Sequence, residues 1–241
     1  MNEYLVEKLK NLNKEEKQHF FFNFIYSFNY GEIKIKDKLF KTEQVNTVKT
    51  LIEAGFDVNT RNYLDATPLF YAQTKEMAEV LIQAGADVNT RDNQKATPLF
   101  CVNSKEIAEI LIQHGADVNA EDNQGNNPLH WIENQEIIQL LIQCGANVHK
   151  KNKHGETPLH LHHGPNSQEI IELLIQSGAD ISVQNNKSQT PAEYHRNYGD
   201  DDLADFIEQK KLEREIKLER EKLNQNLSNS QKSLNKLKNH L

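Results

Sequence analysis

The chain has 241 residues, of which 37% are hydrophobic and 26% charged, and its formal net charge is −7. This negative charge makes a nucleic-acid backbone a poor partner, so binding to DNA or RNA is not expected. No apolar run reaches the length of about 18 residues that a membrane-spanning helix needs. Two cysteines are too few for a disulfide framework. We therefore expect a soluble, cytoplasmic protein with reduced thiols.

Residues 1–30 are predicted to form helices that precede the rest of the fold. The stretch HFFFNFIYSF places Phe21, Phe24, Ile25 and Phe28 on one side of a helix. Because an exposed apolar cluster of this size would favour aggregation, we expect it to cover the open end of the core as an N-terminal cap. The alternative is an apolar patch that binds a partner.

From residue 37 onwards the sequence repeats itself at a nearly fixed spacing. A four-residue helix start such as Thr67-Pro68-Leu69-Phe70 recurs with steps of 30, 30, 30, 30 and 33 residues, and a second segment such as AEVLIQAGADVN recurs with it. The repeated units are 37–66, 67–96, 97–126, 127–156, 157–189 and 190–208. Fixed periodicity of this kind is typical of a stacked repeat fold.

Each unit contains signals for two helices. Thr or Asn before Pro is an N-cap followed by the first helical position, where Pro is tolerated, and it predicts a short helix of about two turns. A second cap starts the next helix, and Gly ends it in the left-handed conformation. The predicted second caps are Thr74, Ser104, Asn134 and Ser167. Because one unit alone exposes its apolar stripe, we expect the units to stack into a solenoid.

With its TPLH and GADVNA segments, the unit resembles the ankyrin repeat family over residues 31–208. The resemblance implies an all-α solenoid of helix-turn-helix units with projecting hairpin loops. It also implies a non-enzymatic protein that holds a protein partner on its concave surface. No cofactor is expected.

The chain departs from the family pattern in three ways. Most units have 30 residues where the family has 33, and the three missing residues fall between the two helices. Phe70 and Phe100 replace the family His, which puts the hydrogen bonds of that His in doubt in two units. The hairpin Gly is replaced at Asp65, Lys95 and Ser188, where a positive φ would cost about 1 kcal/mol.

The resemblance places the binding residues at the hairpin tips and directly after each helix-start tetrad. In the family the position after the tetrad often packs between units, and such packing is the alternative role for Tyr and Trp here. Aromatic and Arg side chains nevertheless dominate the binding energy of protein interfaces. The tip charges, with Arg at one end, are expected to steer a partner with complementary acidic patches. The predicted partner-binding residues are Arg61, Tyr63, Leu64, Tyr71, Arg91, Asn93, Gln94, Glu121, Asn123, Trp131, Lys151 and Lys153. We expect substitutions at the tips to leave the free energy of unfolding nearly unchanged.

One group of residues suggests an alternative function. His154, His160, His162 and His163 lie close in sequence, and two of them are one helical turn apart, as metal ligands can be. A metal-binding or enzymatic protein is therefore a second hypothesis. Against it, the resemblance makes His160 the structural His of its unit, and no catalytic residue is predicted.

Residues 209–241 are predicted to form a charged helix. Leu212, Ile216 and Leu223 fit a heptad seam, but Glu219 and Asn226 interrupt it, which leaves a weak coiled coil. We expect a solvated helix that frays after about residue 224 and a monomeric chain. Self-association through 209–241, in a structural oligomer, is the alternative.

The composition also suggests a source for the protein. Heavy use of Asn, Lys, Gln and Ile is typical of an AT-rich genome, such as that of an intracellular bacterium or a large virus. Ankyrin repeat proteins in such settings often act inside a host cell, so a host-directed effector is a narrower hypothesis.

Overall fold

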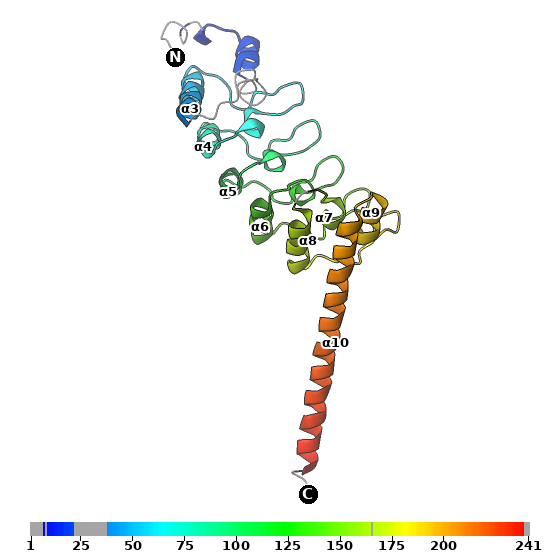
Figure 1. Ribbon diagram of the computed structural model, residues 1–241. Coiled ribbons are helices and arrows are strands. Elements are labelled where there is room, and N and C mark those ends of the chain that lie inside the picture. Colours follow the sequence, from blue (N-terminus) through cyan, green and yellow to red (C-terminus); the bar gives the residue numbers. More distant parts are fainter. Residues whose placement is uncertain (1–6, 8, 22–37, 165, 239–241) are drawn as a thin grey trace.

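The computed structural model describes residues 7, 9–21, 38–164 and 166–238 (Figure 1). These residues form helices, turns and loops without a β-strand, which confirms the predicted all-α fold. No helix in these ranges is both long and apolar enough to cross a lipid bilayer. The units stack along one direction, and contacts between helices join mainly consecutive units.

The second helices of the units form one column along the stack. Each helix in this column contacts the next, because its apolar stripe faces the core and its neighbours. The column consists of α3 (Lys38–Glu53), α4 (Lys75–Gln83), α5 (Lys105–Gln113), α6 (Gln135–Gln143), α8 (Ser167–Gln176) and α10 (Asp201–Lys238).

The first helices form a second, inner column and are shorter than predicted. Three of them are single 3₁₀ turns rather than two-turn α-helices, because the chain becomes extended at the helix end, as at Ala72 and Val102, and reaches the next cap directly. The three residues missing from these units are therefore lost from the first helix and its connection. The column consists of η1 (Pro68–Tyr71), η2 (Pro98–Cys101), η3 (Pro128–His130), α7 (Pro158–Leu161) and α9 (Pro191–Asn197).

The first unit lacks the predicted pair of helices. Its residues 38–53 form the single helix α3. Lys38 stands where later units have Pro, and no Gly or Pro follows before Gly55, so nothing in the sequence ends a first helix.

The predicted caps of the second helices are confirmed in three units and wrong in one. The side chains of Thr74, Ser104 and Asn134 accept hydrogen bonds from backbone N–H groups in the first turns of α4, α5 and α6. Ser167, in contrast, is the first residue of α8, and Asn166 precedes it with a φ of 69°. The longer connection of this unit shifts the helix start by one position.

Leucine side chains at equivalent positions form a continuous core through the stack. Leu99 and Leu129 on the inner column are fully buried, as predicted from the register of the repeat. Leu81, Leu111 and Leu141 occupy the same position in successive helices of the other column and are equally buried. Each unit therefore completes its core with its neighbours.

The N-terminal residues that the structure describes pack on the first units. Phe21 is fully buried, and its ring centroid lies 5.8 Å from that of Phe56. Phe20 contacts the same ring at 6.0 Å. Phe24, Ile25 and Phe28 lie outside the described residues. The contacts of Phe20 and Phe21 support the proposal that this segment caps the stack.

The helix α10 joins the stack through its first turns and then leaves it (Figure 1). Leu203, Ala204 and Ile207 are buried against α8 and α9. Beyond Lys210 every described side chain is exposed, and the helix runs without a break to Lys238. The helix thus continues past residue 224, where fraying was expected, and its described side chains beyond the stack face solvent.

Candidate protein-binding surface

The hairpin tips are built in the same way in the first five units. An Asn or Asp side chain accepts hydrogen bonds from the N–H groups two and four residues later, as Asp92 does from Gln94 and Ala96 at 2.9 Å. This local bond closes the turn. The residues in this role are Asn62, Asp92, Asp122, Asn152 and Asn185.

Consecutive tips are joined by backbone hydrogen bonds. The N–H of Asn93 donates to the carbonyl of Leu64 at 2.9 Å, and that of Asn123 donates to Gln94 at 2.7 Å. The same bond links Lys153 to Gln124 and Asn186 to His154. The tips therefore form one connected row, the hairpin row, rather than independent loops.

The two arginines of the predicted site are part of this connection. Arg61 Nη1 donates to the carbonyls of Asp65 and Arg91 at 2.7 Å, and Arg61 Nη2 donates to Thr90 Oγ1. Arg91 repeats the arrangement one unit later, with the carbonyls of Lys95 and Glu121. The sequence-based expectation that all tip side chains contribute little to stability did not include these bonds, through which each arginine bridges two hairpins.

Further predicted residues at the tips also contact the next or previous unit. Lys151 Nζ donates to the carbonyl of Gln184 at 2.8 Å, and Glu121 forms an ion pair with Lys150. Asn123 Nδ2 donates to the carbonyl of Asn93. Gln94 and Lys153 are exposed and join the hairpin row through their backbones.

The remaining predicted residues present apolar surface. Tyr63 is 82% exposed and Trp131 is 56% exposed, while Leu64 lies at the boundary of exposure. Trp131 Nε1 donates to Asp122 Oδ2 at 3.1 Å, which fixes the indole beside its hairpin. Tyr71 is half-buried, and its hydroxyl accepts a bond from Asn62.

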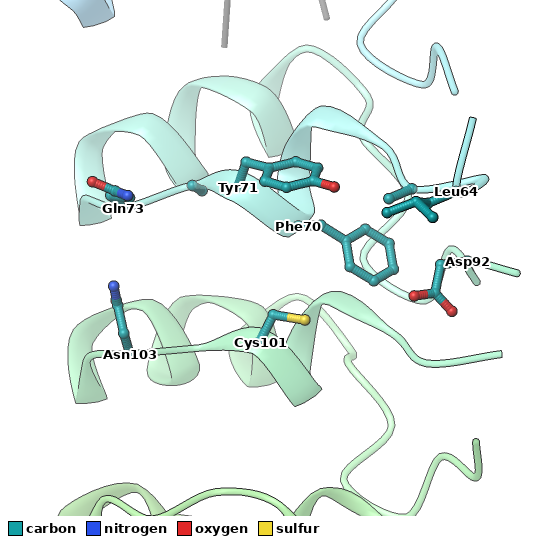
Figure 2. Close-up of a pocket in the computed structure, with 9 residues that line it drawn as sticks. Leu64, Phe70, Tyr71, Gln73, Asp92, Cys101 and Asn103 are labelled. Carbon is teal, nitrogen blue, oxygen red and sulfur yellow. The ribbon is translucent and has the colours of Figure 1, made fainter. Parts of the chain in front are cut away.

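A groove between the second and third units joins these features. Its volume is about 420 Å³, and Figure 2 shows Tyr71 and Phe70 on one side and Cys101 on the other. Leu64 and Asp92 close it toward the hairpin row. Sequence reasoning missed Phe70 as a groove residue, although its replacement of the family His was the available signal.

The thiol of Cys101 lies in this groove beside an acidic group. Enclosure by the groove walls and, to a smaller extent, the Asp92 carboxylate raise the pKa of Cys101 to about 11. The side chain still reaches solvent, so the surrounding walls rather than complete burial cause the shift. Such a thiol is protonated at neutral pH and therefore a poor nucleophile.

The family His, where it is present, links each inner helix to the next unit. His160 Nδ1 accepts from the N–H of Thr157, and its Nε2 donates to the carbonyl of Gln189 at 3.2 Å. His130 makes the equivalent bonds with Asn127 and Glu156.

Where Phe replaces this His, the bonds are lost. In the units with Phe70 and Phe100, the buried hydroxyls of Thr67 and Thr97 have no hydrogen-bond partner among the described residues. The hydrogen bonds of the family His, which the sequence put in doubt for these two units, are therefore absent from the described residues of both units.

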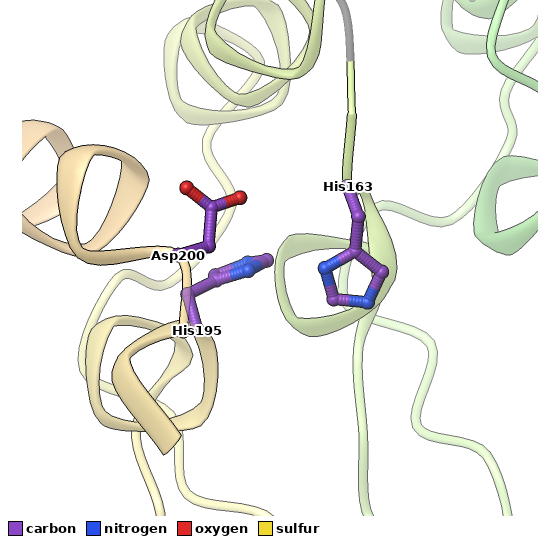
Figure 3. Close-up of side chains that lie close together, drawn as sticks. All are labelled: His163, His195 and Asp200. Carbon is purple, nitrogen blue, oxygen red and sulfur yellow. The ribbon is translucent and has the colours of Figure 1, made fainter. Parts of the chain in front are cut away.

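The four histidines of the alternative hypothesis do not converge on one site. His160 is bonded as above, and buried His162 donates through Nε2 to the carbonyl of Leu129 at 2.7 Å. His154 is exposed at a hairpin tip. His163 instead lies near His195 and Asp200 of the last unit (Figure 3).

Comparison with known proteins agrees with the repeat organisation. The family described as "Ankyrin repeats (3 copies)" matches residues 75–152, 100–185 and 131–207. These overlapping matches together cover more than half of the chain. A search of curated proteins gives no match.

Proposed function

Because the chain belongs to the ankyrin repeat family, whose members generally mediate protein–protein interaction, we propose that it binds a protein partner through its hairpin row and the adjacent groove. One observation carries the proposal. In the described part of the repeats, the exposed large apolar side chains are Tyr63, Leu64, Trp131 and Tyr198. Tyr63 and Leu64 lie in the hairpin row, and Trp131 is bonded to Asp122 directly beside it, where an aromatic anchor has most effect on affinity.

The surface is suited to binding because it is already ordered. Hydrogen bonds between consecutive tips hold the hairpin row in place, so little conformational entropy is lost when a partner docks. The bridging bonds of Arg61 and Arg91 leave their positive charge in place. We therefore expect the partner to present an apolar segment for the groove and acidic groups beside it.

The proposed activity is binding without catalysis. A protonated Cys101 thiol and histidines whose ring nitrogens are bonded to backbone groups support this view. The narrower hypothesis of a host-directed effector, and a cytoplasmic location, rest on composition and cysteine usage alone and stay predictions.

Site-specific cross-linking tests the proposal. A photoreactive amino acid placed at Tyr63 or Trp131 should capture a specific protein from a lysate of the source cell. The same amino acid at Glu79 or Glu109, on α4 and α5 of the other column, serves as the matched control. Capture of the same protein only from the α4 and α5 positions would reject the proposed surface.

One observation favours a second function, self-association through α10. The helix exposes Leu212, Ile216, Leu223 and Leu227 beyond the stack. Sedimentation velocity of the wild type and of an Ile216→Glu/Leu223→Glu variant tests this. A dimer that the variant abolishes would support self-association, and a monomer in both would reject it.

A further inference from the structure

The last two units bring two histidines and an aspartate together near the surface. His163 comes from the longer connection between α7 and α8, whereas His195 lies on α9 and Asp200 directly precedes α10. In Figure 3, His195 and Asp200 lie on one side of the cluster and His163 lies on the other. Their ligand-type nitrogen and oxygen atoms all lie within 4.8 Å of one another.

One ring nitrogen of buried His195 has no hydrogen-bond partner among the described residues. Its Nε2 donates a hydrogen bond to the carbonyl of Leu159 at 2.9 Å, which fixes the proton on that nitrogen. The Nδ1 atom then carries a lone pair, yet it is buried and accepts no hydrogen bond from any residue that the structure describes. An unsatisfied buried acceptor is unfavourable, so this atom is suited to bind a ligand.

This arrangement matches that of metal-binding histidines. A histidine that coordinates a metal through one nitrogen usually donates the other N–H to a carbonyl or carboxylate, which orients the ring. The bond to Leu159 provides this orientation and leaves Nδ1 as the nitrogen that can coordinate, in a ring that lies beside Asp200 and His163.

The other two side chains have the freedom to close the site. Asp200 accepts a hydrogen bond from the N–H of Leu203 through Oδ1, which leaves its second carboxylate oxygen for another ligand. His163 is exposed, and its ring lies 6.1 Å from that of Tyr194. In a tetrahedral zinc site the ligand atoms are about 3.4 Å apart, so a side-chain movement of about 1 Å is needed.

We propose that His163, His195 Nδ1 and Asp200 bind a zinc-type divalent transition metal, with water as the fourth ligand. Two imidazoles and one carboxylate favour such an ion over magnesium or calcium, which prefer oxygen ligands. The ion connects the long connection of the fifth unit to the last inner helix and the start of α10. It therefore acts as a cross-link at the C-terminal end of the stack.

A calorimetric titration of the metal-free full-length chain with zinc tests the site. We expect one equivalent to bind, with an affinity at least about tenfold weaker in His163→Ala and in Asp200→Asn. The Asp200→Asn variant keeps an N-cap side chain, so the start of α10 is preserved. His154→Ala and Asp202→Asn, which remove an exposed His and an exposed Asp elsewhere, should change affinity less than about twofold. Unchanged zinc binding in His163→Ala and Asp200→Asn would overturn the proposal.

Nitrogen chemical shifts give an independent measurement on the intact site. In long-range ¹H–¹⁵N spectra, zinc should shift Nδ1 of His195 while Nε2 keeps its proton. Equal shifts spread over several exposed histidines, with none at His195, would show non-specific binding and contradict the assigned site.

Discussion

The guanidinium group of Arg91 is a clear case in which one side chain holds two units together. It donates to the carbonyl of Lys95 in its own hairpin and to that of Glu121 in the next. We expect Arg91→Ala to lower the free energy of unfolding by about 1–3 kcal/mol, because charged donors to backbone carbonyls are lost. Chemical denaturation measures this.

Two matched variants test whether the two bridging hydrogen bonds cause the loss of stability in Arg91→Ala. Arg91→Lys keeps the charge but cannot bridge both carbonyls, so it should lose most of the same stability. Gln94→Ala, at the neighbouring tip, should stay within about 0.5 kcal/mol of the wild type. A loss in Arg91→Ala no larger than in Gln94→Ala would show that the bridge contributes nothing.

Buried histidines make the stability depend on pH. Burial lowers the pKa of His160 and of His162 to about 4. In the unfolded chain a histidine has a pKa of about 6.5, so between these values only the unfolded state takes up the proton. The free energy of unfolding should therefore be highest above pH 6.5 and fall as the pH is lowered toward 4. The loss by pH 5 is on the order of 1–2 kcal/mol for each histidine.

Denaturation curves between pH 7.5 and pH 5 test this. In His162→Gln, whose amide can still donate to Leu129, the free energy of unfolding should fall less steeply with decreasing pH than in the wild type. His154→Gln, at an exposed position, should keep the full slope. If the free energy of unfolding had the same pH dependence in the wild type and in His162→Gln, the contribution assigned to His162 would be contradicted.

The roles of single residues could be predicted from the sequence where their position in the repeat determines them. The structural bonds of His160 follow from its position in the tetrad, and their loss follows from Phe70 and Phe100. The bridging bonds of Arg61 and Arg91 were missed, because the pattern places a long side chain at a tip without saying which carbonyl it reaches. The approach of His195 to His163 depends on packing between units and was not predictable from spacing.

The hairpin turn requires a left-handed backbone at one position, which offers a test at the scale of the element. Asp65, Lys95 and Ser188 have φ values of 59–60°, at the position where two other units have Gly. Lys95→Gly should raise the free energy of unfolding by up to about 1 kcal/mol. Thermal or chemical denaturation measures the change.

Replacing Gly by Ala in the other two hairpins distinguishes backbone strain from a steric clash of the new side chain. In Gly155→Ala the new Cβ would lie 2.4 Å from Asn186 Oδ1 and 2.8 Å from its backbone nitrogen, whereas in Gly125→Ala the nearest atom is 3.5 Å away. Gly155→Ala should therefore be more destabilising than Gly125→Ala, which loses about 1 kcal/mol through its φ alone. Equal losses would show that the contact with Asn186 has no energetic effect.

Helix starts were more predictable than helix lengths. Thr74, Ser104 and Asn134 are caps because their short polar side chains satisfy the first N–H groups locally. The lengths of η1 and η2 depend on where the shortened connection takes its residues, which local signals do not specify. The single helix α3 likewise follows from the absence of a stop signal.

For the whole molecule, stability depends on units in the middle of the stack. Leu99 and Leu129 are fully buried between neighbouring units. Leu99→Ala and Leu129→Ala should each lower the free energy of unfolding by about 2–5 kcal/mol, since each removes buried methyl groups and leaves a cavity. Leu223→Ala on the exposed part of α10 is the control and should change it by less than about 0.5 kcal/mol.

The architecture was predictable because successive repeat units carry the same helix-start and helix-stop signals. Residues 67–208 could be assigned to stacked units without coordinates, whereas the hairpins and groove as a binding surface stay a proposal. The partner itself does not follow, since a stable frame leaves side chains such as Tyr63 and Trp131 free to suit many proteins.

Calorimetric titration of the captured partner into matched variants tests the proposed binding surface most directly. Tyr63→Ala/Trp131→Ala removes exposed aromatic groups from that surface, and Glu79→Lys/Glu109→Lys changes the charge of α4 and α5. We predict that the first variant weakens binding by at least about 2 kcal/mol, roughly 30-fold, while the second changes it less than about threefold. Loss of binding in the Glu79→Lys/Glu109→Lys variant, with full affinity in Tyr63→Ala/Trp131→Ala, would contradict the account.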